Sequence, residues 1–212
     1  MTPAPGVAFT LAEDGDLRAD HAARARVARQ LGRGDAWATV RQVHGDRVVR
    51  ADGPGDLGAA DAVFTTVPGL PIAVFTADCL GAIMIGEDGV GVAHAGWRGM
   101  AGSVIVALRS AMKSAGLHPA AAYLGPAIGP CCFEVGQEVA ERFPGRTGTT
   151  SWGTGSVDLL TAARDQLDGL ETIWSTGRCT MHDPGHHSHR ATSTSARMAS
   201  IAWRVRQSDT AS

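Results

Sequence analysis

Short apolar runs separated by turn residues dominate the centre of the chain. The segments 62–66, 72–76 and 82–85 are rich in Val, Ile, Ala and Phe. Runs of this length and composition predict buried strands. Glu87-Asp88-Gly89 predicts a hairpin turn into a further strand over 90–94. The centre of the chain is therefore expected to form a sheet.

Helical periodicity follows this central sheet. Residues 100–115 carry Val104, Leu108 and Met112 at helical spacing, and Gly116 ends the pattern. Shorter helices are expected over 21–31, 136–143 and 157–167, the last with Ser156 as its N-cap. Further strands are expected over 36–43, 47–50, 121–124, 172–175 and 199–205, and loops over 51–60 and 145–155.

The order of these elements predicts an α+β fold. Strands and helices do not alternate regularly, and most consecutive strands are joined by fewer residues than a parallel crossover needs. A mainly antiparallel or mixed sheet is therefore expected. The glycines at 86, 89 and 91 do not form a G-x-G-x-x-G sequence, and no Walker sequence is present. Nucleotide binding through a glycine-rich loop is not indicated.

Length and composition indicate one globular domain. The chain has 212 residues, of which 44% are hydrophobic and 19% charged, so it can bury a substantial core. The net charge of −2 gives no reason to expect a nucleic acid or an anionic membrane as partner. No apolar run is long enough to span a bilayer.

The four cysteines indicate a reducing compartment. The chain starts without a basic and then apolar signal sequence, and the adjacent Cys131 and Cys132 are poorly placed to bridge each other. We therefore expect Cys79, Cys131, Cys132 and Cys179 to be thiols or ligands in a cytoplasmic protein.

Three segments place residues with catalytic potential where predicted strands end. They are Arg41–Gly45 with His44, Thr76–Cys79 with Cys79, and His94–Gly99 with His94. Two His and one Cys leave one position of a tetrahedral zinc ion open, which is typical of catalytic sites. A metal-free pair, with the Cys79 thiolate as nucleophile and His94 as base, uses the same side chains. The spacing fits no zinc finger, and a core thiol with two turn histidines stays open as well.

Five sequence motifs make a family resemblance specific. They are RQVHG (41–45), ADAVFTT (60–66), TADC (76–79), HAGWRG (94–99) and GPAIGPCCFEVG (125–136). In this order they resemble the YfiH family, whose members carry names as laccase-like multicopper polyphenol oxidase, purine nucleoside phosphorylase and peptidoglycan editing factor. The resemblance is strongest over 36–205, while residues 1–35 are shortened and divergent. It implies one domain over 1–212, with a layered α/β/β/α sandwich similar to the cytotoxic necrotizing factor catalytic domain.

The resemblance also implies a metal centre and an activity. It implies one zinc ion per chain, with His44, Cys79 and His94 as ligands. The implied enzyme is a purine nucleoside phosphorylase that acts on adenosine, inosine, guanosine and methylthioadenosine with phosphate as co-substrate, and that also deaminates adenosine. A multicopper laccase is not expected, because the single His-x-His pair, His187-Ser188-His189, supplies too few copper ligands.

Further residues are assigned to the reaction as expectations. Cys79, His94 and Asp78 are the expected catalytic residues, with Asp78 as orienting partner or proton carrier. Arg98 is expected to clamp phosphate or substrate, since a guanidinium matches two phosphate oxygens. Arg190 and His189 are expected to contact the substrate as well.

The C-terminal segment departs from the family pattern. Cys179-Thr180 is followed by His186-His187 and His189, where the family carries an aromatic Phe-Phe-Ser-Tyr run, and the next Arg and Asp are replaced. Cys179 and His182 could therefore belong to a second metal site, whereas Cys131 and Cys132 are expected to be core thiols.

Two other functions stay open at this point. One is a Cys79/His94 amide hydrolase or editing factor that acts on peptidoglycan precursors, and the other is a non-catalytic metal-binding regulator. The expected assembly is a monomer or a weak homo-oligomer.

Overall fold

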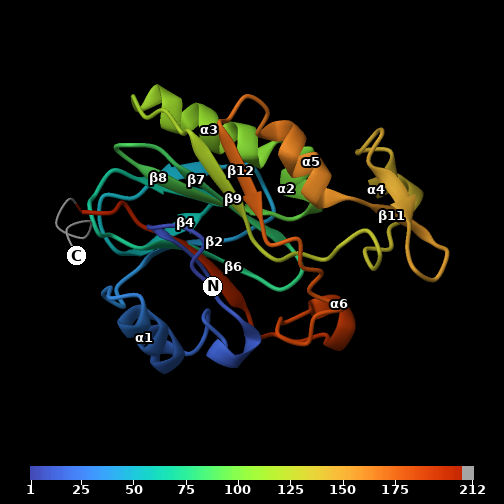
Figure 1. Ribbon diagram of the computed structural model, residues 1–212, viewed down its shortest axis with the longest axis horizontal. Helices are drawn as coiled ribbons and strands as arrows, with labels where there is room; N and C mark the ends of the chain where they lie inside the picture. The colour runs from blue at the N-terminus through green and yellow to red at the C-terminus, as the bar shows by residue number, and fades with distance from the viewer. Residues whose placement is uncertain (207–212) are drawn as a thin grey trace.

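Two β-sheets stack face to face in the computed structural model of the protein, which describes residues 1–206 (Figure 1). The first sheet has the order β1 (Val7–Phe9), β13 (Met198–Ala202), β6 (Ile72–Thr76), β2 (Ala38–Arg41) and β4 (Gly55–Ala59). The second has the order β12 (Thr172–Ser175), β9 (Ala121–Leu124), β7 (Leu80–Ile85), β8 (Val90–Ala95), β5 (Ala62–Thr65) and β3 (Val48–Arg50). A separate pair consists of β10 (Thr147–Thr149) and β11 (Gly155–Val157).

Apolar side chains from both sheets form the central core. Phe9, Ile72 and Val74 of the first sheet pack against Ile83 and Val92 of the second, and all five are at most 1% exposed. Alternate residues of a strand point to opposite faces, so each sheet also has an outer apolar face to cover.

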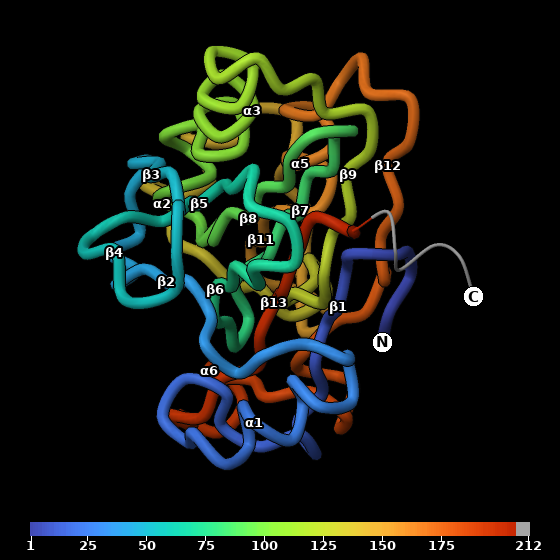
Figure 2. Tube along the Cα trace, turned by 90° about the vertical axis from the view of Figure 1, so that its left-hand side faces the viewer, coloured from blue at the N-terminus to red at the C-terminus, as the bar shows by residue number. Residues whose placement is uncertain are grey.

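Helices cover these outer faces. The helices are α1 (His21–Gln30), α2 (Trp97–Ala101), α3 (Val104–Ser114), α4 (Gln137–Ala140), α5 (Leu159–Gln166) and α6 (His189–Thr192), with a 3₁₀ turn at Ala12–Asp14. Leu108 and Met112 of α3 pack on the second sheet, and Val27 of α1 packs beside Phe75 on the first. Figures 1 and 2 show α3 and α1 on opposite sides of the stacked sheets. The α+β class and its α/β/β/α layering are confirmed.

The sheets are mixed, in agreement with the prediction, and antiparallel pairs outnumber parallel ones. Strand β2 pairs in parallel with β4 and β6, β3 with β5, and β9 with β12, while the other pairs are antiparallel. Consecutive strands β2 and β3 lie in different sheets, as do β5 and β6. The short links after β2 and β5 therefore cross from one sheet to the other and do not close hairpins. For this reason the length of a link does not tell whether neighbouring strands in a sheet are parallel.

Several expected elements differ in the structure, and the loop expected over 145–155 contains β10. The segment 51–60, expected as loop, contains β4, whose pairing with β2 outweighs its low strand propensity. The helix expected over 100–115 is broken between α2 and α3, where Ser103 has a φ of 63°. Asp158, not Ser156, caps α5 by accepting a hydrogen bond from the Thr161 amide, and Ser156 lies in β11.

The prediction of one domain covers residues 1–212, and the sequence also predicts no membrane-spanning segment. Residues 207–212, which the single-domain prediction includes, lie outside the described residues. Among the helices of residues 1–206, none has the length and apolar character that crossing a membrane requires.

Two links between the sheets bring distant segments to one end of the molecule. Residues 77–79 connect β6 to β7, and residues 42–47 connect β2 to β3. Because β2 and β6 are parallel neighbours, both links leave the first sheet at the same edge. The end of β8 pairs with the start of β7, so that Gly81 lies opposite His94. His44, Cys79 and His94 therefore meet at this edge.

Candidate metal centre and its cavity

The side chains of His44, Cys79 and His94 converge as donors for one metal ion. One donor atom from each residue lies within 4.8 Å of the others. The two imidazole rings have centroids 4.8 Å apart and meet edge to face at 76°. Two imidazole nitrogens and one thiolate are borderline-soft donors of the kind that zinc binds. The three residues that the sequence motifs singled out are therefore brought together in a group that could hold a metal ion.

Asp61, the residue before β5, holds His94 and the turn around His44 in position. Its carboxylate is fully buried, and Oδ1 lies 2.8 Å from His94 Nδ1. The same carboxylate accepts hydrogen bonds from the amides of Val43, His44 and Gly45 at 2.7–3.1 Å. Since Nδ1 of His94 is engaged, Nε2 is left as its donor for a metal.

The backbone is held in unusual conformations at two of the site positions. His44 has a φ of 61° and Asp78 a φ of 86°, in the left-handed region that disfavours residues with a side chain. Three amide bonds to Asp61 hold the turn around His44. Strain that neighbouring contacts over-determine is concentrated at functional sites.

Gly96 leaves room for the cluster. A Cβ at this position would lie 3.0 Å from both Cys79 Sγ and the His44 ring. Any side chain here would therefore push the thiol and the ring out of place, which explains why a glycine follows the strand that carries His94.

The charges of the cluster reinforce one another. Burial acts to raise the pKa of the Cys79 thiol, but hydrogen bonds and charge from His44 and His94 outweigh it and lower the pKa to about 6. Burial acts to lower the pKa of His94, but Asp61 and Cys79 outweigh it and raise the pKa to about 9. At neutral pH the metal-free site therefore holds a thiolate beside an imidazolium.

A cavity of about 240 Å³ opens onto the cluster. Its lining combines the three candidate ligands with polar and apolar groups: Arg18, Gln42, Phe75, Thr76, Ala77, His189 and Arg197. Gln42 is fixed by two 2.8 Å hydrogen bonds to the main chain of Phe75. The cavity thus offers a bound molecule both the metal centre and two guanidinium groups.

The expected substrate and catalytic residues are distributed unevenly around this cavity. His189 lines it. Arg98 is exposed, stacks on the Trp97 ring at 4.3 Å and is not among the lining residues. Arg190 donates to the Glu134 carbonyl oxygen at 3.0 Å and is likewise not among them.

Asp78 supports the neighbouring segment rather than the histidines. Its Oδ1 accepts a 2.6 Å hydrogen bond from the Thr180 hydroxyl, and its Oδ2 accepts a 2.7 Å bond from the Arg190 amide. Asp61, and not Asp78, makes the contact that orients His94.

Sequence reasoning missed Asp61, Arg18 and Arg197. Asp61 stands inside the ADAVFTT motif, so the motif could have drawn attention to it. Arg18 and Arg197 lie near opposite ends of the chain and in no recognised motif. Their meeting at one cavity depends on β1 pairing with β13, which the sequence did not reveal.

Stacked sheets between helices, with a His₂Cys cluster open to a cavity at one edge, define a sandwich protein with a candidate metal centre. A family model described as multi-copper polyphenol oxidoreductase laccase matches residues 9–205, and the chain belongs to this family, the YfiH/DUF152 family.

Relatives and solved structures agree with this membership. The chain is 37% identical to "Purine nucleoside phosphorylase ORF3" of Streptomyces griseus, over 89% of this chain and 82% of the relative. It is 36% identical to "Purine nucleoside phosphorylase YfiH" of Escherichia coli, over 78% and 73%. The structure of YfiH from Bacillus licheniformis aligns with a TM-score of 0.79 at 27% identity, covering 87% of this chain and 80% of the other. YlmD from Geobacillus stearothermophilus aligns with a TM-score of 0.77 at 28% identity, covering 88% and 82%.

Proposed function

We propose that the protein is a zinc-dependent purine nucleoside phosphorylase that uses phosphate as co-substrate. The observation that carries the proposal is the His44–Cys79–His94 group facing a cavity that two arginines also line. The names of the relatives support the same reaction class. Adenosine, inosine, guanosine and methylthioadenosine are the proposed substrates, with adenosine deamination as a second activity.

The donor set fits zinc. Three protein ligands leave one position for a reacting molecule, which is the pattern of catalytic zinc sites. When bound, zinc supplies a Lewis acid that stabilises negative charge developing on a substrate atom. Asp61 holds His94 through Nδ1, so that Nε2 would be the nitrogen that binds the ion, and Gly96 keeps the space beside Cys79 and His44 clear.

Arg18 and Arg197 are the proposed phosphate site. Burial and the charge of Arg18 lower the pKa of Arg197, which means that the two guanidinium groups repel each other in the cavity. An anion between them would relieve this repulsion and accept several charge-assisted hydrogen bonds. The arginines therefore take the role that the sequence assigned to Arg98 and Arg190.

His189 is the proposed contact for the nucleoside. It lies in the cavity lining, and its Nδ1 is 3.2 Å from the Thr194 carbonyl oxygen. This contact leaves Nε2 free to face a ligand. Asp78 holds the segment of His189 through the Arg190 amide, so we propose that it acts on the reaction by positioning.

A Cys79/His94 amide hydrolase is the second candidate, because the Cys79 pKa of about 6 makes it a thiolate without any metal. The two candidates differ in how Cys79 reacts. A zinc ligand resists alkylation until a chelator removes the ion, whereas a free nucleophile is alkylated rapidly from the start.

Incubation of adenosine with and without phosphate tests the proposed function. Zinc-replete protein should form adenine and ribose 1-phosphate only when phosphate is present, and inosine in either condition. Cys79→Ala should form neither product, and Arg98→Met is the matched surface control. Absence of both products at high enzyme concentration would contradict the proposal and favour the non-catalytic metal-binding regulator.

We also propose that the protein acts in the cytoplasm as one domain and as a monomer or weak homo-oligomer. Cys79, Cys131, Cys132 and Cys179 are all free of disulfide bonds, which suits a reducing compartment. Light scattering at several protein concentrations measures the assembly, and a mass that stays at four chains or more on dilution would contradict it.

A further inference from the structure

A second group of metal-ligating side chains lies apart from His44, Cys79 and His94. It consists of Cys131, Cys132, Cys179 and His182, whose donor atoms all lie within 4.8 Å of one another. No residue is shared between the two groups. The proposed phosphorylase chemistry uses none of these four residues, so their convergence calls for a separate explanation.

The distance between two donors of this group is close to that around a tetrahedral ion. Cys131 Sγ and His182 Nδ1 are 3.7 Å apart. Zinc bonds of about 2.3 Å to sulfur and about 2.0–2.1 Å to nitrogen, at tetrahedral angles, separate a sulfur from a nitrogen ligand by roughly 3.5 Å. An ion between them would therefore need only a small adjustment of the side chains.

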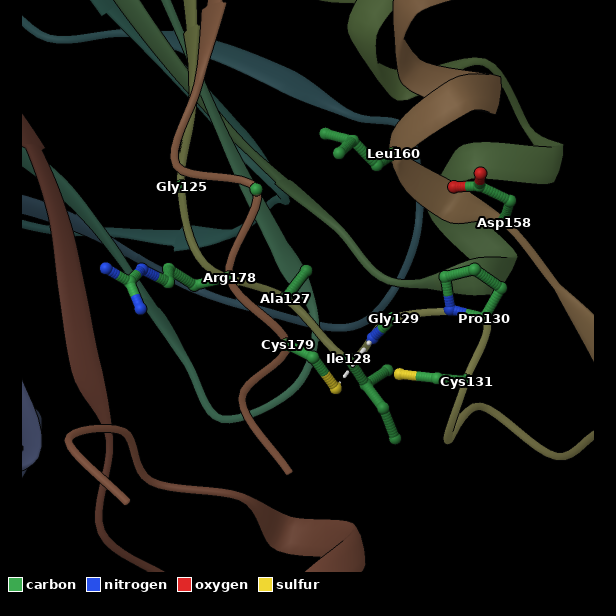
Figure 3. Close-up of a pocket in the computed structure, with 11 residues that line it drawn as sticks. Gly125, Ala127, Ile128, Gly129, Pro130, Cys131, Asp158, Leu160, Arg178 and Cys179 are labelled. Carbon is green, nitrogen blue, oxygen red and sulfur yellow. Dashed lines mark hydrogen bonds between the residues drawn. The ribbon is translucent and has the colours of Figure 1, made fainter. Parts of the chain in front are cut away.

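The main chain around Cys179 is arranged to stabilise a thiolate. The Gly129 amide donates to Cys179 Sγ at 3.2 Å. Figure 3 shows the sulfur atoms of Cys179 and Cys131 pointing toward each other, with Gly129 beside them. An amide that donates to a cysteine sulfur favours the charged form that ligates metals.

The four donors are not ordinary core residues. Cys132 is fully buried, but Cys131 and Cys179 are half-buried and His182 is exposed. Cys131 and Cys132, which were expected to be core thiols, do pack in or against the core, but both also belong to this group of possible ligands. Cys131 and Cys132 lie between β9 and α4, and Cys179 and His182 lie between β12 and α6. The four donors therefore stand on irregular segments.

We propose that Cys131, Cys132, Cys179 and His182 bind a second zinc ion in a closed, structural Cys₃His site. Four protein ligands complete a tetrahedral zinc and leave no position for a substrate, which distinguishes this site from the three-ligand centre. In a reducing compartment, a cysteine cluster of this kind serves metal binding rather than disulfide formation. The inference does not depend on the proposed nucleoside reaction.

The second ion would stiffen the wall of the cavity. Thr180, between two of its ligands, donates to Asp78, which also accepts from the Arg190 amide. An isolated bridge pairs Ala127 with Cys179, and the Gly129 amide donates to Cys179 Sγ across the same two segments. The ion would therefore tie the segment that carries His189 to the turn at 129–132.

Metal analysis of the full chain tests the proposal. Wild-type protein, purified without chelator and dialysed, should contain two zinc ions per chain, and Cys79→Ala should contain one. His182→Ala should bind its second ion at least tenfold more weakly in a chelator competition, whereas His118→Ala, which also removes an exposed imidazole, should match the wild type. One zinc in the wild type and none in Cys79→Ala would overturn the second site.

Cobalt substitution in Cys79→Ala gives a readout that does not depend on activity. Cobalt(II) alone should give the intense absorption of a tetrahedral ion with thiolate ligands, and Cys131→Ser together with His182→Ala should lose it. A weak octahedral spectrum in Cys79→Ala would overturn the proposal.

Thiol labelling of the wild-type protein covers the case in which the double variant does not fold. Cys131, Cys132 and Cys179 should be protected from alkylation until a chelator is added. Equal labelling with and without chelator, or a disulfide between any two of them, would overturn the site.

Discussion

The two Cys/His groups of this protein sit on different kinds of support. His44, Cys79 and His94 stand on links and strand ends of the two sheets, and Asp61 and Gly96 fix their geometry from buried positions. Cys131, Cys132, Cys179 and His182 lie on irregular segments outside the sheets. The first group has three donors and faces a cavity, whereas the second has four. If both groups bind metal as proposed, the sheets would hold the open centre in place, whereas the closed centre would itself hold its irregular segments together.

Removing the soft ligand of the open centre is the largest expected effect. Cys79→Ala should lose the ion held with His44 and His94, and the rate of phosphorolysis should fall roughly a thousandfold or more, since a Lewis acid is worth several kcal/mol. Ribose 1-phosphate formation and zinc content measure the two consequences. Retention of full activity would break the comparison, because the open centre would then not be the reactive one.

Removing the negative charge of Asp61 is the second largest expected effect. Asp61→Asn should weaken zinc binding about 10–100-fold, because the carboxylate that orients His94 is lost. Weakening the buried interactions of Asp61 with His94 and the 43–45 turn should also lower the free energy of unfolding by about 3–5 kcal/mol. Urea unfolding and chelator competition measure both effects. Asp52→Asn, which removes an exposed aspartate, is the control, and an equal effect there would contradict the role of Asp61.

Zinc binding at the open centre should depend on pH. The pKa of His94 is raised to about 9 in the metal-free protein, so a proton must leave the ring before it can ligate. The apparent affinity should therefore rise about tenfold per pH unit up to about 9, and more steeply below about 6, where Cys79 is protonated as well. Chelator competition on the Cys131→Ser, His182→Ala variant isolates this centre. An affinity that does not change between pH 6 and 9 would contradict the charge pattern.

Substituting an arginine of the cavity should have the smallest effect on the reaction. Arg18→Met should raise the KM for phosphate about tenfold with little change in kcat, since charge-assisted hydrogen bonds to the anion are lost. Arg98→Met removes another exposed guanidinium, which lies outside the cavity lining, and should leave the KM unchanged. The reverse pattern would return the phosphate site to Arg98.

Motifs at strand ends made the grouping of His44, Cys79 and His94 predictable. The α+β class and most strands followed from apolar runs, because a buried strand has to be apolar whatever its partner. His44, Cys79 and His94 followed from family motifs rather than from spacing. Their spacing along the chain did not predict that they meet, because the links at 42–47 and 77–79 that bring them together each cross from one sheet to the other.

Long-range pairing explains what the sequence did not reveal. Strand β4 is rich in glycine and forms through its neighbour β2. Arg18 and Arg197 reach one cavity only after the two ends of the chain have paired. Cys131 and Cys179 are likewise distant in sequence and adjacent in space, so that three thiols without a shared motif were not predictable as one group.

Anomalous diffraction at the zinc edge, from crystals of protein purified without chelator, tests the central claim most directly. We expect one peak bonded to His44, Cys79 and His94, with its fourth position held by a non-protein atom, and a second peak bonded to four protein ligands. An absent first peak, or a first peak whose four ligands all come from the protein, would contradict an open catalytic centre.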